Sequence, residues 1–326
     1  MVFYNTCNKQ RDRNRLGNES QQGVRVWCFI RYEVCGVLGS QDSVRRLPTN
    51  RLLNASPIGL FDSGLGGLTV LRELYRQIPQ ESVLYFGDTA RLPYGTKSQA
   101  QIQQYFREIL TWMEQCGVKM VVMACNTSSA LALEAVRDQF TVPILGLILP
   151  GARAAVQCGR RIGVIATPAT AASDAYRRAI LEVDATVDVW QVSCPEFVPL
   201  VEQNRVEDPY TYRIARTYLE PLLAEKIDTL IYGCTHYPYL APVLQRILSP
   251  SVQLVDPAVH VVTAAVQELD LLGLRNVRSP QPTRFCVSGC PDTFNQLATH
   301  WLGYTPFAEQ IQLPEVDQSV ALEAVE

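Results

Sequence analysis

The residues from Met120 to Thr127 read MVVMACNT, a short apolar run that ends in a cysteine followed by two small polar residues. A similar run, TLIYGCTH, covers Thr229 to His236. Each is preceded by another apolar run, Ile58 to Phe61 in the first case and Ile162 to Ala166 in the second. The first cysteine follows the start of its upstream run by 67 positions and the second by 72. The same order of elements therefore occurs twice, which predicts two similar halves.

Short β-branched runs alternate with helical segments from Pro57 onward, a pattern typical of a mainly parallel sheet covered by helices. We therefore predict an α/β fold of two similar open, mainly parallel-sheet domains related by pseudo-two-fold symmetry. Both cysteines then follow strands at the carboxyl edge, where such sheets bind ligands, so the active site is expected in the cleft between the domains. The expected strands are 58–61, 83–86, 120–124, 142–145, 162–166, 229–232 and 252–257, and the expected helices are 68–77, 97–116 and 128–139.

The predicted domain boundaries follow from this repeat. The first domain, which carries Cys125, is expected to take residues 57–150 and 257–315, and the second, which carries Cys234, residues 151–256. Residues 316–326 are expected to form a tail.

Residues 1–55 differ from the rest of the chain. They are polar and Arg-rich from Asn5 to Gln22, and they lack both a sustained helical period and the uninterrupted apolar core of a signal peptide. Three interpretations compete: a flexible extension, an incorrectly chosen translation start, and a small extra structural element. We favour the first two and assign no function to this region.

Composition narrows the class of protein. With 326 residues, 47% of them hydrophobic, the chain can bury a large core. Its apolar runs are far shorter than the roughly 20 residues that cross a bilayer, so no membrane span is expected. The basic excess lies in residues 1–55 and the remainder is acidic, which argues against an obligatory nucleic-acid partner.

Cysteine usage indicates a reducing compartment. Ten cysteines in a chain of this length do not form the dense disulfide framework of a small secreted domain, so we expect reduced thiols and a cytoplasmic location. Cys286 and Cys290 have a spacing that suits two metal ligands, but no second Cys/His pair accompanies them. No metal site is predicted.

The duplicated cysteines suit proton exchange at a carbon acid. Racemisation without a cofactor needs one group to remove a proton from one face and another to deliver a proton to the opposite face. Cys125 is expected beside the N-terminus of a helix that begins near Ser128, and this position favours the thiolate form of its side chain. The alternative to a catalytic role is a buried structural cysteine beside a helix cap. His236 lies two positions from Cys234 and can lower the thiol pKa or carry its proton, whereas the alternative is a surface imidazole.

Two further loops are expected at the same edge of the sheet. Residues 61–68, FDSGLGGL, form a Gly-rich turn between a strand and a helix. They lack the spacing of a phosphate or dinucleotide fingerprint, so a substrate carboxylate is the better-sized anion. Asp62 is then a partner for Cys125 or for a substrate ammonium, with helix capping as the alternative. Residues 87–95 follow the next strand and can form a wall of the same site.

With these motifs assembled, the chain resembles the aspartate/glutamate racemase family, and within it the enzymes that act on glutamate, over roughly residues 57–307. The residues that carry the resemblance are GLFDSGLGG at 59–67, FGDTARLPYG at 86–95, ACNT at 124–127, CPEFVPLVE at 194–202 and GCTHYP at 233–238.

The resemblance implies a two-base interconversion of L- and D-glutamate that needs no cofactor and supplies D-glutamate for peptidoglycan, usually in a homodimer. It implies that Cys125 and Cys234 are the acid/base pair, that Asp62 assists the first and His236 the second, and that Glu202 lies near the second cysteine. The substrate site implied by the family comprises Asp62, Ser63, Tyr94, Gly95, Asn126, Thr127, Thr235 and His236.

Four alternatives remain at this point. A racemase of aspartate or another amino acid would use the same thiol pair. A decarboxylase of related fold needs only one of the two cysteines, so the presence of both argues against it. A regulatory role through gyrase binding is reported for some glutamate-specific members of the family. A Cys-His hydrolase is disfavoured because no third orienting group is evident.

Overall fold

The computed structural model describes residues 54–314. The interpretations of residues 1–55 as an extension or a wrong start, and of residues 316–326 as a tail, concern parts of the chain that lie outside the described residues, apart from Asn54 and Ala55. None of the helices in the described part is long and apolar enough to cross a membrane.

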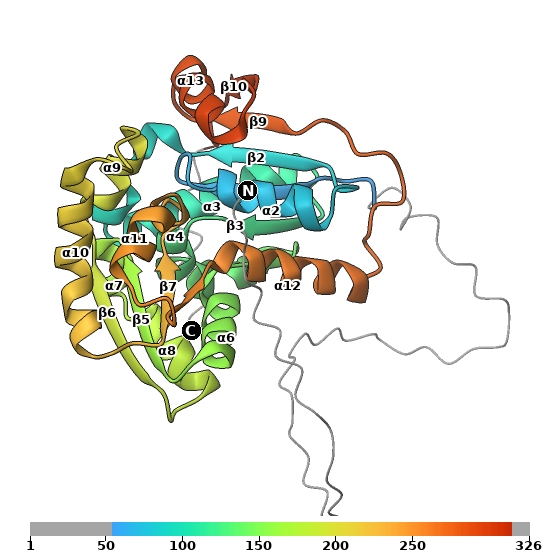
Figure 1. Ribbon diagram of the computed structural model, residues 1–326. Coiled ribbons are helices and arrows are strands. Elements are labelled where there is room, and N and C mark those ends of the chain that lie inside the picture. Colours follow the sequence, from blue (N-terminus) through green and yellow to red (C-terminus); the bar gives the residue numbers. More distant parts are fainter. Residues whose placement is uncertain (1–53, 315–326) are drawn as a thin grey trace, which may run out of the picture. The chain divides into compact units, whose positions relative to one another are not determined.

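Two parallel sheets organise the described residues (Figure 1). The first has six strands in the order β10-β9-β2-β1-β3-β4, and the second has four in the order β6-β5-β7-β8. The strands of the first sheet are β1 (Ile58–Asp62), β2 (Val83–Gly87), β3 (Met120–Met123), β4 (Ile144–Leu145), β9 (Arg284–Val287) and β10 (Ala308–Gln310). Those of the second are β5 (Arg161–Ala166), β6 (Asp188–Ser193), β7 (Thr229–Gly233) and β8 (Gln253–Val255).

The strand order confirms the duplication. Within the first sheet β2-β1-β3-β4 are neighbours in that order, and β6-β5-β7-β8 repeat it in the second, with every pairing parallel. The strand that leads into Cys125 and the strand that leads into Cys234 therefore occupy equivalent places. The prediction of two similar open α/β halves is confirmed, while the two-fold relation between them stays a prediction.

Helices cover the sheets in the way the alternating pattern predicts. The α-helices are α2 (Leu68–Gln77), α3 (Gln99–Gln115), α4 (Asn126–Leu131), α5 (Leu133–Val136), α6 (Ile148–Cys158), α7 (Pro168–Ala172), α8 (Ala175–Val183), α9 (Phe197–Glu202), α10 (Pro209–Ala224), α11 (Ala241–Ile247), α12 (Pro257–Leu271) and α13 (Pro291–Leu302). Short 3₁₀ turns cover Thr89–Arg91, Tyr94–Thr96, Arg137–Gln139 and Tyr237–Leu240. Helix α12 packs against α2 beside the first sheet and against α6 of the second half.

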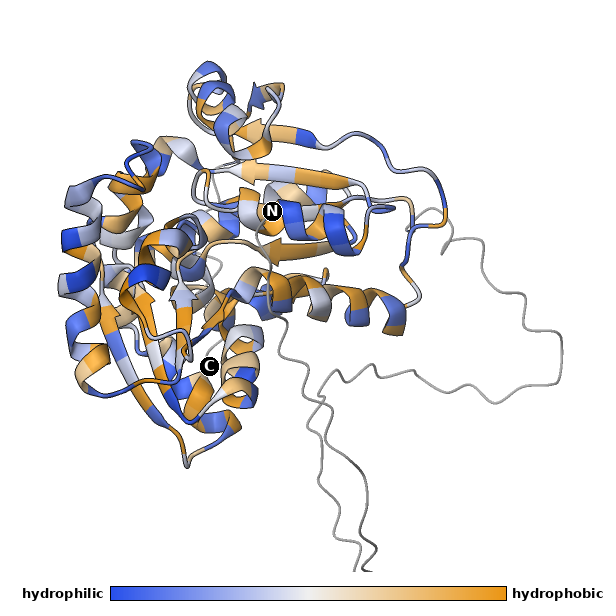
Figure 2. Ribbon diagram, viewed as in Figure 1, coloured by the Kyte–Doolittle hydropathy of each residue, from blue (hydrophilic) through white to orange (hydrophobic). Residues whose placement is uncertain are grey.

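Both faces of the first sheet are buried, as expected for parallel strands covered by helices. Side chains alternate between faces along a strand, so Ile58 and Leu60 of β1 belong to one apolar cluster and Phe61 to the other. The clusters explain why the strands are almost continuously apolar, as the colouring of Figure 2 shows. The sheets are therefore rigid supports for the loops that leave their carboxyl edges.

The predicted helix 128–139 is the least accurate of the sequence-based elements. The structure starts the helix at Asn126, two residues earlier, and divides the segment into α4, α5 and a 3₁₀ turn. The Ser129 hydroxyl donates to the carbonyl oxygen of Cys125, four residues before it, and accepts from the Leu147 amide. Hydroxyls that bond back to the helix carbonyl in this way bend and weaken a helix.

Two predicted strands are shorter in the structure. Residues 142–145 reduce to β4, because Pro143 has no amide hydrogen to donate to a sheet. Residues 252–257 reduce to β8, because the Asp256 carboxylate accepts from the Ala258 amide and Pro257 opens helix α12.

Candidate functional site

Cys125 and Cys234 lie at the carboxyl ends of the equivalent strands β3 and β7. Both side chains are buried, with exposed fractions of 5% and 7%. Their position is the one at which open α/β sheets bind ligands.

The Gly-rich loop after β1 presents a buried carboxylate. Asp62 ends β1 and is fully buried, and its Oδ2 accepts from the Gly64 amide at 2.9 Å. The Tyr85 hydroxyl donates to the Gly64 carbonyl at 2.8 Å and fixes the loop. Burial raises the pKa of Asp62 against the opposing effects of His236 and of backbone amides. Oδ1 accepts no hydrogen bond from residues 54–314, so it is available to a ligand or a thiol.

Cys125 lies among hydroxyl groups and close to Asp62. Its Sγ is 3.7 Å from the Ser63 Oγ. Burial, and then the negative charge of Asp62, raise the thiol pKa to about 11, although the nearby Ser128 and Ser63 act in the opposite direction. The backbone of Ser128, in the first turn of α4, lowers the thiol pKa as predicted, but burial and the neighbouring carboxylate outweigh it and the net shift is upward.

Cys234 has a different neighbour, an imidazole. Its Sγ is 3.7 Å from His236 Nδ1, and His236 Nε2 is 3.2 Å from Glu202 Oε1 at the end of α9. Burial lowers the pKa of His236, but the contacts with Cys234 and Glu202 outweigh it and raise the pKa above its usual range. The surface imidazole considered as the alternative is excluded, because His236 is only 4% exposed.

The loop after β1 packs directly on the loop that carries Cys234. A β-carbon built at Gly66 would lie 2.6 Å from His236 Nδ1, so only glycine allows this approach. The Thr69 hydroxyl donates to the Thr235 carbonyl at 3.3 Å. Asp62 is close enough for its charge to affect Cys125 and to be affected by His236. A continuous set of buried contacts therefore joins the two cysteine loops.

A cluster of three threonine hydroxyls joins the halves beside Asn126. Thr127 Oγ1 lies 3.0 Å from Thr167 Oγ1 and 3.1 Å from Thr170 Oγ1, and the latter two are 2.9 Å apart. A β-carbon built at Gly95 would contact Thr167 at 3.3 Å. Thr167 and Thr170 were not among the predicted site residues. Their signal was available, since Thr167 directly follows β5 and Thr170 lies in α7, at the place in the second half that corresponds to the Gly-rich turn after β1.

Tyr94 is held by its hydroxyl rather than left free for a ligand. That hydroxyl donates to the buried carboxylate of Asp88, which also accepts from Arg91 Nε at 2.6 Å and from Ser288 Oγ at 2.7 Å. Tyr94 remains close enough to Cys125 for the sulfur's charge to affect its pKa. The phenol hydroxyl is therefore already paired within this loop.

Tyr176 is a third residue that the sequence did not single out. Its hydroxyl donates to Asn126 Oδ1 at 2.6 Å, from helix α8 of the second half. Because both side chains are buried, this bond fixes a polar group next to Cys125.

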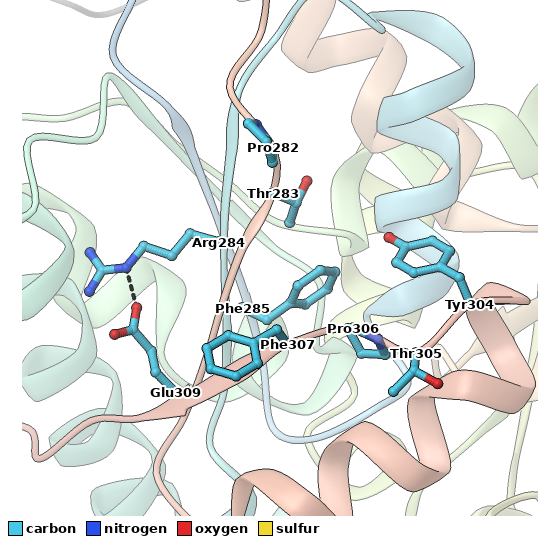
Figure 3. Close-up of a pocket in the computed structure, with 9 residues that line it drawn as sticks. All are labelled: Pro282, Thr283, Arg284, Phe285, Tyr304, Thr305, Pro306, Phe307 and Glu309. Atoms are coloured by element: carbon cyan, nitrogen blue, oxygen red, sulfur yellow. Dashed lines mark hydrogen bonds and ion pairs between the residues drawn. The ribbon is translucent and has the colours of Figure 1, made fainter.

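The pair Cys286 and Cys290 lies apart from these contacts. Cys286 is buried in β9, and Cys290 is exposed at the start of α13. Within residues 54–314 no three or more His, Cys, Asp or Glu side chains gather in a group that could hold a metal ion. A separate pocket lies beside β9 and β10, where Figure 3 shows the Arg284–Glu309 ion pair, Tyr304 and the exposed Phe307, and it includes none of the predicted site residues.

Comparison with known proteins places the described fold among amino-acid racemases. The sequence model of the Asp/Glu/Hydantoin racemase family matches residues 58–268. The chain is 67% identical over 264 residues to the glutamate racemase of Nostoc sp. (strain PCC 7120 / SAG 25.82 / UTEX 2576). The aligned residues cover 81% of this chain and 90% of that relative.

Two solved structures are also similar. Glutamate racemase isoform RacE1 from Bacillus anthracis has a TM-score of 0.77 and 37% identity, covering 81% of this chain and all (100%) of that one. The Francisella tularensis glutamate racemase, solved in complex with D-glutamate, has a TM-score of 0.76 and 34% identity, covering 79% of this chain and 98% of that one.

Proposed function

The chain belongs to the Asp/Glu/hydantoin racemase family, and we propose that it interconverts L- and D-glutamate without a cofactor, with Cys125 and Cys234 exchanging the α-proton from opposite faces of the substrate. The observation that carries this proposal is the buried loop after β1, whose Ser63 lies 3.7 Å from Cys125 and whose Gly66 packs against His236, the neighbour of Cys234. The similarity to glutamate racemases supports glutamate as the substrate.

In the proposed reaction one sulfur begins as thiolate and the other as thiol. The thiolate takes the α-proton, so that a C–H bond breaks and an S–H bond forms, and the electron pair is delocalised into the substrate carboxylate. The opposite thiol then delivers its proton to the other face, which leaves it as thiolate. For a substrate whose α-proton faces Cys234, the raised pKa of Cys125 leaves it in the thiol state that the second step needs.

We assign supporting roles from the neighbours of each sulfur. Asp62 Oδ1 can accept the proton of Cys125, and His236 can accept the proton of Cys234 while Glu202 compensates the charge. The proposed substrate-binding residues are Asp62, Ser63, Tyr94, Gly95, Asn126, Thr127, Thr235 and His236. Thr167 and Thr170 add hydroxyls that can turn from their mutual hydrogen bonds to donate to a substrate carboxylate.

The family resemblance supports a cellular role as well. We propose that the protein supplies D-glutamate for peptidoglycan, that it acts in the cytoplasm and that it works as a homodimer. The dispersed cysteines of the described residues, which form no disulfide there, fit a reducing compartment.

The decisive experiment is solvent exchange in deuterated water. Purified full-length protein is incubated with L- or D-glutamate and no added cofactor, and circular dichroism and mass spectrometry follow the enantiomer ratio and the α-deuterium. We expect both enantiomers to reach the same mixture with deuterium at the α-carbon. No exchange with glutamate would refute the proposal, and faster exchange with aspartate would assign the chain to aspartate instead.

Two cysteine variants test the mechanism. Cys125→Ala and Cys234→Ala should each abolish racemisation in both directions while the far-ultraviolet circular dichroism stays that of the wild type. Cys290→Ala is the matched control, because this cysteine is exposed and outside the site, and it should racemise like the wild type. Full activity in either of the first two variants would exclude a two-thiol mechanism.

A further inference from the structure

Tyr176 provides a side-chain hydrogen bond that crosses from the second half to the residue next to Cys125. It belongs to α8, whereas Asn126 is the first residue of α4. The phenol hydroxyl donates to Asn126 Oδ1 at 2.6 Å, and the exposed fractions of the two residues are 0% and 3%. A bond this short between buried groups has no water competing for either partner.

The bond determines which way the Asn126 amide faces. A side-chain amide has one acceptor oxygen and two N–H donors on opposite sides. With the oxygen directed at Tyr176, the Nδ2 donors face away from the phenol, and Nδ2 donates to no acceptor within residues 54–314. Asn126 therefore offers two oriented donors beside Cys125, and a carboxylate is the complementary acceptor.

The phenol itself is held in place. Tyr176 is part of an apolar cluster of the second half, and a β-carbon built at Gly151 of α6 would contact its ring at 3.4 Å. Burial, followed by the negative charges of Asp256 and Cys234, raises the pKa of Tyr176 well above its usual value, so the hydroxyl keeps its proton and remains a donor. The same interaction with Cys234 places Tyr176 near both cysteines.

We propose that Tyr176 is a positioning residue, which holds the Asn126 amide so that its N–H groups point at the substrate carboxylate. A binding group of the first half is then oriented only while the second half is in contact with it. The inference rests on the proposed function, since it specifies how the glutamate site is organised.

The test is the steady-state kinetics of Tyr176→Phe, which removes only the hydroxyl. We expect KM for both glutamate enantiomers to rise about tenfold, the factor that corresponds to about 1.4 kcal/mol of binding, with kcat changed by less than about threefold. Tyr75→Phe is the matched control: Tyr75 also donates a 2.6 Å hydrogen bond, to Thr283, within the first half and away from the site. Its KM and kcat should equal those of the wild type.

A double-mutant cycle separates positioning from packing. If Tyr176 acts through Asn126, Tyr176→Phe should change KM by less than about twofold in an Asn126→Ala background. The same tenfold change in both backgrounds, or an unchanged KM in an active Tyr176→Phe protein, would overturn the inference alone. A wild-type protein that does not racemise glutamate would refute the proposed function and this inference with it.

Discussion

Replacing Glu202 by Gln tests whether the carboxylate controls the charge of His236. The two side chains are 3.2 Å apart, between Nε2 and Oε1, and His236 is buried while the Glu202 side chain is 31% exposed. Gln keeps the size of the side chain and an acceptor oxygen but removes the negative charge. The pKa of His236 should therefore fall, because one of the contacts that raise it is weakened.

The expected size follows from Coulomb's law. Two unit charges 3.2 Å apart attract by roughly 1.3 kcal/mol in water and about 5 kcal/mol at an effective dielectric constant of about 20. Partial exposure of Glu202 brings solvent screening, so the lower end applies. About 1.4 kcal/mol corresponds to one pKa unit, and we expect the pKa of His236 to fall by about one unit.

Nuclear magnetic resonance of the histidine rings measures this directly, because the chain has three histidines. Glu73→Gln is the reciprocal control. The pKa of His260 is lowered by burial and raised in part by Glu73, so this variant should lower the pKa of His260 and leave that of His236 unchanged. If Glu202→Gln moves the pKa of His236 by less than about 0.3 unit, or upward, the assigned coupling is wrong.

Two further variants probe charges buried in the first half. Lys119→Met should lower the free energy of unfolding, measured in urea, by about 3–5 kcal/mol, because Lys119 Nζ is 2.5 Å from the buried Glu81 carboxylate and its loss leaves that charge unpaired. Adding Glu81→Leu to this variant should restore much of the stability, and a further loss of stability would contradict this explanation. Asp62→Asn should lower the pKa of Cys125 from about 11 by roughly half a unit to one unit, because the negative charge of Asp62 is removed. The pH dependence of thiol alkylation measures this pKa, and an unchanged profile would mean that burial alone raises it.

The sequence predicted best those elements that depend on local pattern. The helix expected at 68–77 has those bounds in the structure, and the strands before both cysteines agree to within one residue. Apolar periodicity and small-residue turns determine these elements, so they can be recognised from neighbours in the chain. The helix expected at 128–139 failed because its course depends on the Ser129 hydroxyl, which bonds Cys125 and the distant Leu147.

The site residues also fall into those that a local sequence pattern predicts and those that depend on contacts between distant parts of the chain. Asp62 and Cys125 were recognisable because they directly follow strands of a duplicated pattern. Tyr176 was not, because it reaches Asn126 from a helix of the other half and no local motif records that contact. The helix beside Cys125 could be expected from the sequence, but the burial and the Asp62 charge that raise the thiol pKa arise only in the folded chain.

The duplicated halves have the same strand order but give their thiols unequal surroundings. Burial and the Asp62 carboxylate favour the protonated form of Cys125 against the opposing effect of nearby serines, whereas Cys234 contacts the imidazole of His236, which is paired with Glu202. Two-base racemisation needs one thiol and one thiolate at the start of each turnover. In the proposed reaction this difference keeps Cys125 as the thiol when the α-proton of the substrate faces Cys234, whereas the opposite enantiomer requires Asp62 to take the proton of Cys125 first.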